Sequence, residues 1–191
     1  MKFLGRLRRG SRQIQGNQPQ LWAVYAVIIF LGSLYLASEI LSWRSSLDAA
    51  QFFGISGALL QRGQVYRLFT AMLFHLGIIH LLMNMLVLHM LGSVVEVLVG
   101  SARFFVIFIL AGLTGTAFSA VFNDAQIISV GASGAIMGLL GYIIACKLTA
   151  PWSIPQAISQ WAMSLLIINL VWNVVSPMGL DVWGHGGGFV G

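Results

Sequence analysis

Long apolar runs separated by short polar turns fill most of this sequence. Only 8% of its 191 residues are charged, whereas a soluble domain carries about a quarter. Because about 20 consecutive apolar residues form a helix that can cross the hydrocarbon core of a bilayer, this composition excludes an ordinary soluble domain. It predicts an all-α fold, a polytopic transmembrane helix bundle.

The positions of the runs predict six helices. We expect spans at residues 21–41, 77–99, 104–121, 131–148 and 157–175, and a sixth that opens at Trp183. The sequence given ends about eight residues into this sixth run, too few to cross a bilayer, so we expect the sixth helix to be truncated here. Residues 42–66 are too mixed to span and too apolar for a free loop, which favours a segment embedded in the membrane interface.

Basic residues are concentrated at the N-terminus. The first twelve residues contain five Lys and Arg and no acid: Lys2, Arg6, Arg8, Arg9 and Arg12. Such a run can bind nucleic acid in a soluble protein, but directly before a span it indicates a cytoplasmic N-terminus instead. The first apolar run is also longer than that of a signal peptide. We therefore expect a basic cytoplasmic tail at residues 1–20, a transmembrane domain at residues 21–191, and no nucleic-acid partner.

Nine polar or ionisable residues lie in or beside the expected spans, where such groups are costly and often functional. They are His75, His80, Asn84, His89, Glu96, Ser133, Asn169, Asn173 and His185. His80 and Asn84 are four residues apart and share a helix face, whereas the nine residues from His80 to His89 turn these two rings in roughly opposite directions. The sequence also lacks an HExxH motif. We therefore expect no metal and no cofactor.

Ser133 begins the fourth expected helix, within the sequence GASG at residues 131–134. Two structural roles could explain it. A serine at a helix N-terminus can cap the free N–H groups, and Gly134 and Gly138 form a GxxxG pattern that lets membrane helices pack closely. The third possibility is a nucleophile, which needs a nearby base and oxyanion donors. The pattern is not the GxSxG elbow, because alanine follows Gly134.

His185 could be the base that such a serine needs. It opens the sixth helix at the same depth and on the same side of the membrane as Ser133, with glycines on both sides of it. Those glycines would let the fourth and sixth helices approach until the Ser133 hydroxyl meets the imidazole. His80 and Asn84 descend from the same face and could supply donors. Taken alone, His185 could equally be a polar residue in a glycine-rich packing interface, but the shared depth and side of all four residues favour a site.

Three motifs in this order resemble those of the rhomboid family of intramembrane serine proteases. GASG at 131–134 resembles the family's GxSG motif, HLGIIHLLMN at 75–84 its HxxxxHxxxN motif, and GHGGG at 184–188 its histidine motif on the sixth helix. Tyr66-Arg67 resembles the aromatic–Arg pair that closes the first external loop, and Glu96 stands where a glutamate commonly ends the second helix. The resemblance covers residues 20–191 and implies a six-helix rhomboid-like core.

The resemblance also implies the chemistry. Ser133 and His185 would form a catalytic dyad, and the oxyanion hole would combine the side chains of His80 and Asn84 with the backbone N–H groups of Ser133 and Ala132. Ser133 would attack the scissile carbonyl of a single-span membrane protein near the outer face of the bilayer, and water would hydrolyse the acyl-enzyme. Such a serine endopeptidase has other membrane proteins and the lipid bilayer as its partners.

Two further residues near the expected dyad need an interpretation. Met137 occupies a position where many family members have an aromatic residue that packs against the histidine ring. Asp181 lies four residues before His185, and we interpret it as a solvated loop residue rather than as a third catalytic member.

Two other classes of function remain. A non-catalytic rhomboid-like protein would bind or escort other membrane proteins, but such relatives usually lack the serine or the histidine that this chain has. A small transporter would have paired broken helices in two similar halves, which the sequence does not show. The short basic N-terminus, without an organelle-targeting pattern, favours an integral protein of a bacterial plasma membrane.

Overall fold

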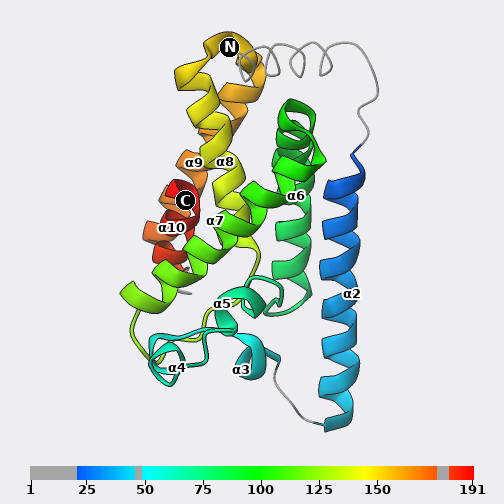
Figure 1. Ribbon diagram of the computed structural model, residues 1–191, viewed down its shortest axis with the longest axis vertical. Coiled ribbons are helices and arrows are strands. Elements are labelled where there is room, and N and C mark those ends of the chain that lie inside the picture. Colours follow the sequence, from blue (N-terminus) through cyan, green and yellow to red (C-terminus); the bar gives the residue numbers. More distant parts are fainter. Residues whose placement is uncertain (1–20, 46–48, 176–180) are drawn as a thin grey trace.

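The computed structural model describes residues 21–45, 49–175 and 181–191, and this part of the chain is almost entirely helical (Figure 1). The six expected helices are present as α2 (Trp22–Ser45), α6 (Ile78–Val99), α7 (Ser101–Phe122), α8 (Ser133–Thr149), α9 (Gln156–Val175) and α10 (Val182–Val190). The predicted all-α helix bundle is therefore confirmed. The basic tail at residues 1–20 lies outside the described residues.

Three of these helices are long and apolar enough to cross a membrane: α2 over Trp22–Leu41, α6, and α7. The helix α8 and the first part of α9, Gln156–Ile168, are shorter apolar helices. With 17 residues, α8 is about 25 Å long at 1.5 Å per residue, which is less than the roughly 30 Å thickness of a hydrocarbon core. At least one end of α8 therefore lies inside the layer that its longer neighbours cross.

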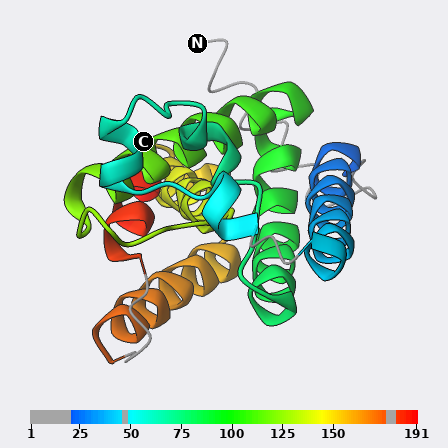
Figure 2. The same cartoon turned by 90° about the horizontal axis from the view of Figure 1, so that it is seen from below.

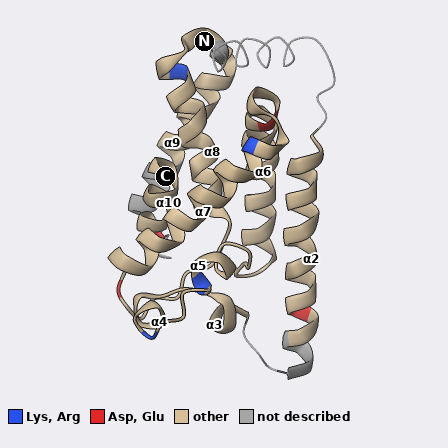
Figure 3. Ribbon diagram, in the orientation of Figure 1, with Lys and Arg blue, Asp and Glu red and all other residues tan. Residues whose placement is uncertain are grey.

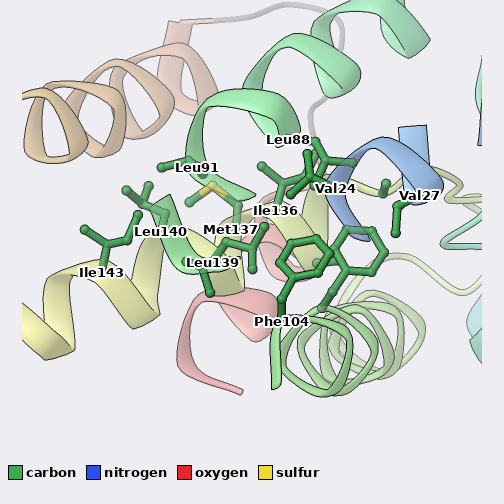
Figure 4. Close-up of a cluster of buried hydrophobic side chains, with 14 of the residues drawn as sticks. Val24, Val27, Leu88, Leu91, Phe104, Ile136, Met137, Leu139, Leu140 and Ile143 are labelled. Atoms are coloured by element: carbon green, nitrogen blue, oxygen red, sulfur yellow. The ribbon is translucent and has the colours of Figure 1, made fainter. Parts of the chain in front are cut away.

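The helix α8 occupies the centre of the bundle. It contacts α6, α7, α9 and α10, while α2 and α9 lie at the periphery (Figure 2). The main hydrophobic core forms where α2, α6, α7 and α8 meet (Figure 4). Its members include Val24, Leu88, Leu91, Phe104, Leu139 and Leu140. Met137, at the position where many family members have an aromatic residue, belongs to this core as well.

Glycines bring the backbones of α7, α8 and α10 nearly into contact. A Cβ atom on Gly188 of α10 would collide with the carbonyl oxygen of Gly134 on α8, and one on Gly138 would collide with Ala111 of α7. Small residues are the usual means by which membrane helices approach so closely. We call this contact the glycine seam, formed by Gly115, Gly134, Gly138, Gly184 and Gly188. The sequence predicted the approach of α8 and α10, and the structure adds α7 to it.

Three short helices follow α2: α3 (Ala49–Phe53), α4 (Gly57–Gln61) and α5 (Arg67–Thr70). They lie at the end of the bundle where α8 begins (Figure 1). Arg67 is buried and holds this region together, since its guanidinium donates to the carbonyl oxygens of Gln51 and Gly54 at 2.9 and 2.7 Å. An isolated β-bridge joins Ile55 to Ser129 in the loop before α8. The short helices thus support the loop that leads to Ser133.

The Lys, Arg, Asp and Glu residues of the described chain lie toward the two ends of the bundle (Figure 3), as expected if its middle lies in hydrocarbon. Away from the short helices, Glu96 joins α6 to α2. Its buried carboxylate accepts the backbone N–H groups of Ala23 and Val24, at 3.1 and 2.9 Å, and the hydroxyl of Ser101 at 2.6 Å. The first-turn N–H groups of a helix have no intrahelical acceptor. The Glu96 carboxylate supplies acceptors for two such groups of α2.

Candidate active site

Ser133 and His185 meet at the end of the bundle where the short helices lie. The Ser133 Oγ and His185 Nε2 atoms are 2.9 Å apart, a hydrogen-bond distance. Ser133 is the first residue of α8 and His185 lies in the first turn of α10. The N-cap of α8 is Ala132, so Ser133 is not the capping serine that one structural role required. Its hydroxyl is paired with an imidazole from another helix.

Gly131 shapes the backbone just before this serine. Its φ of +133° is a conformation that side-chain-bearing residues rarely adopt, and its N–H donates to the carbonyl oxygen of Ala71 at 2.8 Å. A Cβ atom at this position would lie 2.8 Å from Cε1 of His80 and 3.9 Å from Oγ of Ser133. The glycine is therefore required both by the turn and by the His80 ring, which lies against it.

His80 and Asn84 both lie on α6, one helical turn apart. His80 is next to the loop that carries Ser133, and Asn84, which is buried, lies further into the bundle. The Asn84 amide donates one hydrogen bond to the carbonyl oxygen of His80 at 2.9 Å. An asparagine amide has two N–H groups, so a second one can donate to a ligand. The structure thus brings His80 to the serine loop and places Asn84 one turn deeper.

The backbone N–H of Ala132 points toward another histidine. Its acceptor is Nε2 of His75, 3.5 Å away in the loop before α6. The His75 ring packs edge-on against His80, with ring centroids 5.2 Å apart. Burial, and secondarily His80, lower the pKa of His75 to about 4, so His75 is an uncharged acceptor at neutral pH. The Ala132 N–H is directed to a protein group here, and its place in an oxyanion hole stays a prediction.

Two ring nitrogens at this site are buried without a hydrogen-bond partner in the part of the chain that the structure describes. They are Nδ1 of His75 and Nδ1 of His185. Buried polar atoms in folded proteins nearly always have a partner. For His185, the consequence is that no carboxylate among the described residues holds the ring through Nδ1.

Asp181 is not the solvated loop residue that the sequence indicated. It is the partly buried N-cap of α10, and its Oδ1 atom accepts the backbone N–H of Gly184 and the side-chain amide of Asn123, each at 2.7 Å. That interpretation was wrong because it weighed Asp181 only as a partner of the His185 ring. Its place directly before a helix, where Asp is a favoured N-cap, was the signal that could have found its role.

A cavity of about 30 Å³ adjoins Ser133. Its lining combines Ser133, Thr116, Ser129 and Asp181 with Val130 and the glycines at 112, 115, 131, 134 and 184. This volume is enough for about one water molecule, and a polar lining is what such a water needs. The cavity is therefore large and polar enough to hold one water molecule beside Ser133.

The remaining polar candidates are elsewhere. The His89 ring lies against Tyr25 of α2, with centroids 5.6 Å apart, so it faces away from His80 as their spacing predicted. Glu96 belongs to the contact between α6 and α2. The side chains of Asn169 and Asn173 lie outside the described part of the structure. Among the residues that are described, no three His, Cys, Asp or Glu side chains form a group that could hold a metal ion.

Comparison with known proteins finds one family. The model of the Rhomboid domain matches residues 62–191. Rhomboid protease GluP of Bacillus subtilis (strain 168) is 32% identical over 178 residues, which cover 93% of this chain and 34% of that protein. RHOMBOID-like protein 1 of Arabidopsis thaliana is 35% identical over 134 residues, 69% of this chain and 33% of that protein. The putative rhomboid protease YdcA of the same Bacillus strain is 29% identical over 171 residues, 88% of this chain and 82% of that protein. The chain spans about a third of the length of the first two relatives.

Proposed function

Because the chain belongs to the rhomboid family, we propose that it is an intramembrane serine endopeptidase with a Ser133–His185 dyad that cleaves single-span membrane proteins near the outer membrane face. The observation that carries this proposal is the 2.9 Å contact between Ser133 Oγ and His185 Nε2, made by residues 52 positions apart. A role in packing alone requires the glycines of the seam but not a hydroxyl and an imidazole directed at each other. The protease names of two bacterial relatives support the same reaction.

The dyad accounts for both halves of the reaction. His185 Nε2 accepts the Ser133 proton as Oγ attacks the scissile carbonyl carbon, and it then gives this proton to the leaving amine. The acyl group stays on Ser133. A water molecule next gives a proton to His185 while its oxygen attacks the acyl carbon, and the proton returns to Ser133 as the carboxylic acid leaves. The cavity beside Ser133 is the position from which we expect this water to act.

The oxyanion that forms at the substrate carbonyl needs preorganised donors. We assign to it the His80 ring, the free amide N–H of Asn84 and the backbone N–H of Ser133. The last of these is one of the first N–H groups of α8, which have no intrahelical acceptor and face a favourable helix dipole. The Ala132 N–H joins this set only after it leaves His75.

The short length of α8 supports a site within the membrane. Lys147 lies in the last turn of α8, at the opposite end from Ser133. If Lys147 is at the inner interface, a helix of about 25 Å ends before it reaches the outer interface. Ser133 would then lie a few ångströms inside the outer surface, where a transmembrane substrate enters water. We further propose that residues 1–20 are cytoplasmic, that residues 21–191 form the transmembrane domain, and that the membrane is a bacterial plasma membrane.

The alternative is a non-catalytic rhomboid-like protein that binds or escorts membrane proteins. The two are separated by labelling the full-length protein in detergent with a fluorophosphonate, which reacts with activated serines. We expect labelling of the wild type and of Ser129→Ala, whose serine lines the same cavity, and none of Ser133→Ala. Equal labelling of the wild type and Ser133→Ala would exclude the dyad.

A second measurement tests the base. His185→Ala should lose cleavage of a model single-span substrate by about 10⁴-fold or more, as catalytic serines lose activity without their histidine. Cleavage by His185→Ala at the rate of the wild type would remove His185 from the reaction.

A further inference from the structure

The ring of His185 lacks the partner that orients the base in a triad. Its Nδ1 atom is buried and has no hydrogen-bond partner among the described residues. The position of the ring therefore depends on where the backbone of α10 lies. Since α10 begins at Val182, only three residues before His185, the start of this helix decides that position.

Asp181 holds the start of α10 in two ways. Its side-chain Oδ1 accepts the N–H of Gly184 at 2.7 Å, and its backbone carbonyl accepts the N–H of His185 at 2.9 Å. The backbone of His185 is thus hydrogen-bonded to the backbone of Asp181, and the backbone of Gly184 is bonded to the Asp181 carboxylate.

Asn123 ties this cap to another helix. It is the C-cap of α7, and its side-chain amide donates to Asp181 Oδ1 at 2.7 Å and to Ser119 Oγ at 3.0 Å. Both N–H groups of the amide are used. The chain Ser119–Asn123–Asp181–Gly184 therefore links the end of α7 to the first turn of α10.

The glycine seam leaves little tolerance for movement of this turn. The Gly184 carbonyl oxygen lies 2.8 Å from where a Cβ atom of Gly115 would be, and 3.2 Å from that of Gly134. The seam thus stops α10 from moving inward, and the Asn123–Asp181 hydrogen bond stops it from moving outward. A displacement of about 1 Å at a reacting pair can lower a rate by roughly a hundredfold.

We propose that Asp181, held by Asn123, is a positioning residue that keeps His185 in contact with Ser133. It acts through hydrogen bonds to the first turn of α10 and not by touching a reacting atom. This inference rests on the proposed function, since it assigns a role in the reaction of the same dyad.

The test uses full-length protein in detergent and compares the rate of fluorophosphonate labelling of Ser133 across four variants. Asp181→Ala and Asn123→Ala should label at least about tenfold more slowly. This is the effect typical of removing a hydrogen-bond partner that orients a functional residue. Asp181→Asn keeps an oxygen that accepts from both Gly184 and Asn123, so it should stay within about threefold of the wild type. Asp124→Ala is the matched control, because this exposed acid is adjacent to Asn123 but bonds to the N–H of Gln126.

A second readout separates this inference from the proposed function. In a ¹⁵N NMR spectrum of labelled imidazoles, residues 1–191 contribute the signals of four histidines, and the signal that disappears in His185→Ala is that of His185. We expect Asp181→Ala to shift the His185 signal and to leave the His89 signal in place. If the wild type labels no faster than Ser133→Ala, the proposed function fails, and the NMR comparison still tests the positioning of the ring.

Two results would overturn the inference. One is an Asp181→Ala protein with the labelling rate and His185 signal of the wild type. The other is an Asp181→Asn protein as slow as Asp181→Ala, which would mean that the charge of Asp181 matters and its hydrogen bonds do not. If Asp181→Ala fails to fold, Asn123→Ala decides by the same two measurements, because it removes the same link from the α7 side.

Discussion

Two buried polar clusters lie at opposite ends of α6, and they differ in how completely they are hydrogen-bonded. At one end, the Glu96 carboxylate accepts three donors, from α2 and from Ser101. At the other end, Ser133 and His185 make one contact with each other. There, Nδ1 of His75 and of His185 is buried without a partner in the described chain.

The difference indicates what each cluster is for. A fully satisfied buried charge stabilises the contact between two helices, and it leaves no group free to bind anything else. A cluster with unpaired donors and acceptors costs stability, and proteins accept such a cost mainly where a substrate or a reaction uses those groups. Changes at the Ser133 cluster should therefore lower activity more than stability, and changes at Glu96 should do the reverse.

The largest effect on the reaction, apart from that of the dyad, should come from Asn84→Ala. Removing one oxyanion donor typically slows catalysis by about 10²–10³-fold, so we expect a loss of this size in kcat for a model substrate. Ser93→Ala is the control, since Ser93 also lies on α6 and also bonds to the carbonyl oxygen four residues before it. An Asn84→Ala enzyme as fast as Ser93→Ala would remove Asn84 from the oxyanion hole.

A smaller loss is expected from a methyl group in the glycine seam. Gly188→Ala places a Cβ atom against the Gly134 carbonyl, and overpacking of this kind costs about 1–3 kcal/mol. Both the midpoint of thermal unfolding and the rate of Ser133 labelling should fall. Gly186→Ala is the matched control on the same helix, because a Cβ atom there meets nothing within 4 Å. Equal behaviour of the two variants would show that the seam does not set the contact between Ser133 and His185.

At the other cluster, Glu96→Gln should lower the free energy of unfolding by about 2 kcal/mol, a typical value for hydrogen bonds to a charged group. The side-chain oxygen of glutamine can accept one of the two backbone N–H groups of α2. Its NH₂ group would face the other N–H, and two donors cannot form a hydrogen bond. Glu39→Gln on exposed α2 surface should change stability little. Labelling per folded molecule should stay at the wild-type value in both, and a selective loss of labelling in Glu96→Gln would contradict the separation of the two ends.

The smallest effect concerns pH. Burial lowers the pKa of His75 from 6.5 to about 4. Between these two pH values, the unfolded chain therefore binds a proton at His75 that the folded protein does not bind. Stability therefore falls as the pH falls through about 6.5 and levels off only below about 4. Between pH 7.5 and 5.5 the His75 contribution is about 1 kcal/mol. The wild type should lose this much more than His75→Gln in thermal unfolding, and parallel curves would contradict it.

Much of the fold could be predicted because hydropathy acts over long, continuous stretches. Helices α2, α6 and α9 begin or end within a few residues of the predicted spans. The helical repeat also placed His80 and His89 on different sides of α6, as their contacts with Gly131 and Tyr25 show. Both inferences need only the local chain, whose periodicity is set by backbone geometry.

Other features depended on partners that are distant in the sequence. The N-cap role of Asp181 has a local signal, but its hydrogen bond with Asn123, 58 residues away, has none. The engagement of the Ala132 N–H by His75, 57 residues away, had no local signal either.

The sequence by itself determined that this is a membrane helix bundle and which helices it has, and it predicted which polar residues share one depth and one side. Those properties follow from composition and from the repeat of a helix. Only the tertiary structure decided that Ser133 Oγ and His185 Nε2 are 2.9 Å apart and that Asn123 of α7 bonds to Asp181 at the start of α10. The physical reason is that such contacts depend on how three helices pack across the glycine seam, where a methyl group on Gly188 would collide with the Gly134 carbonyl.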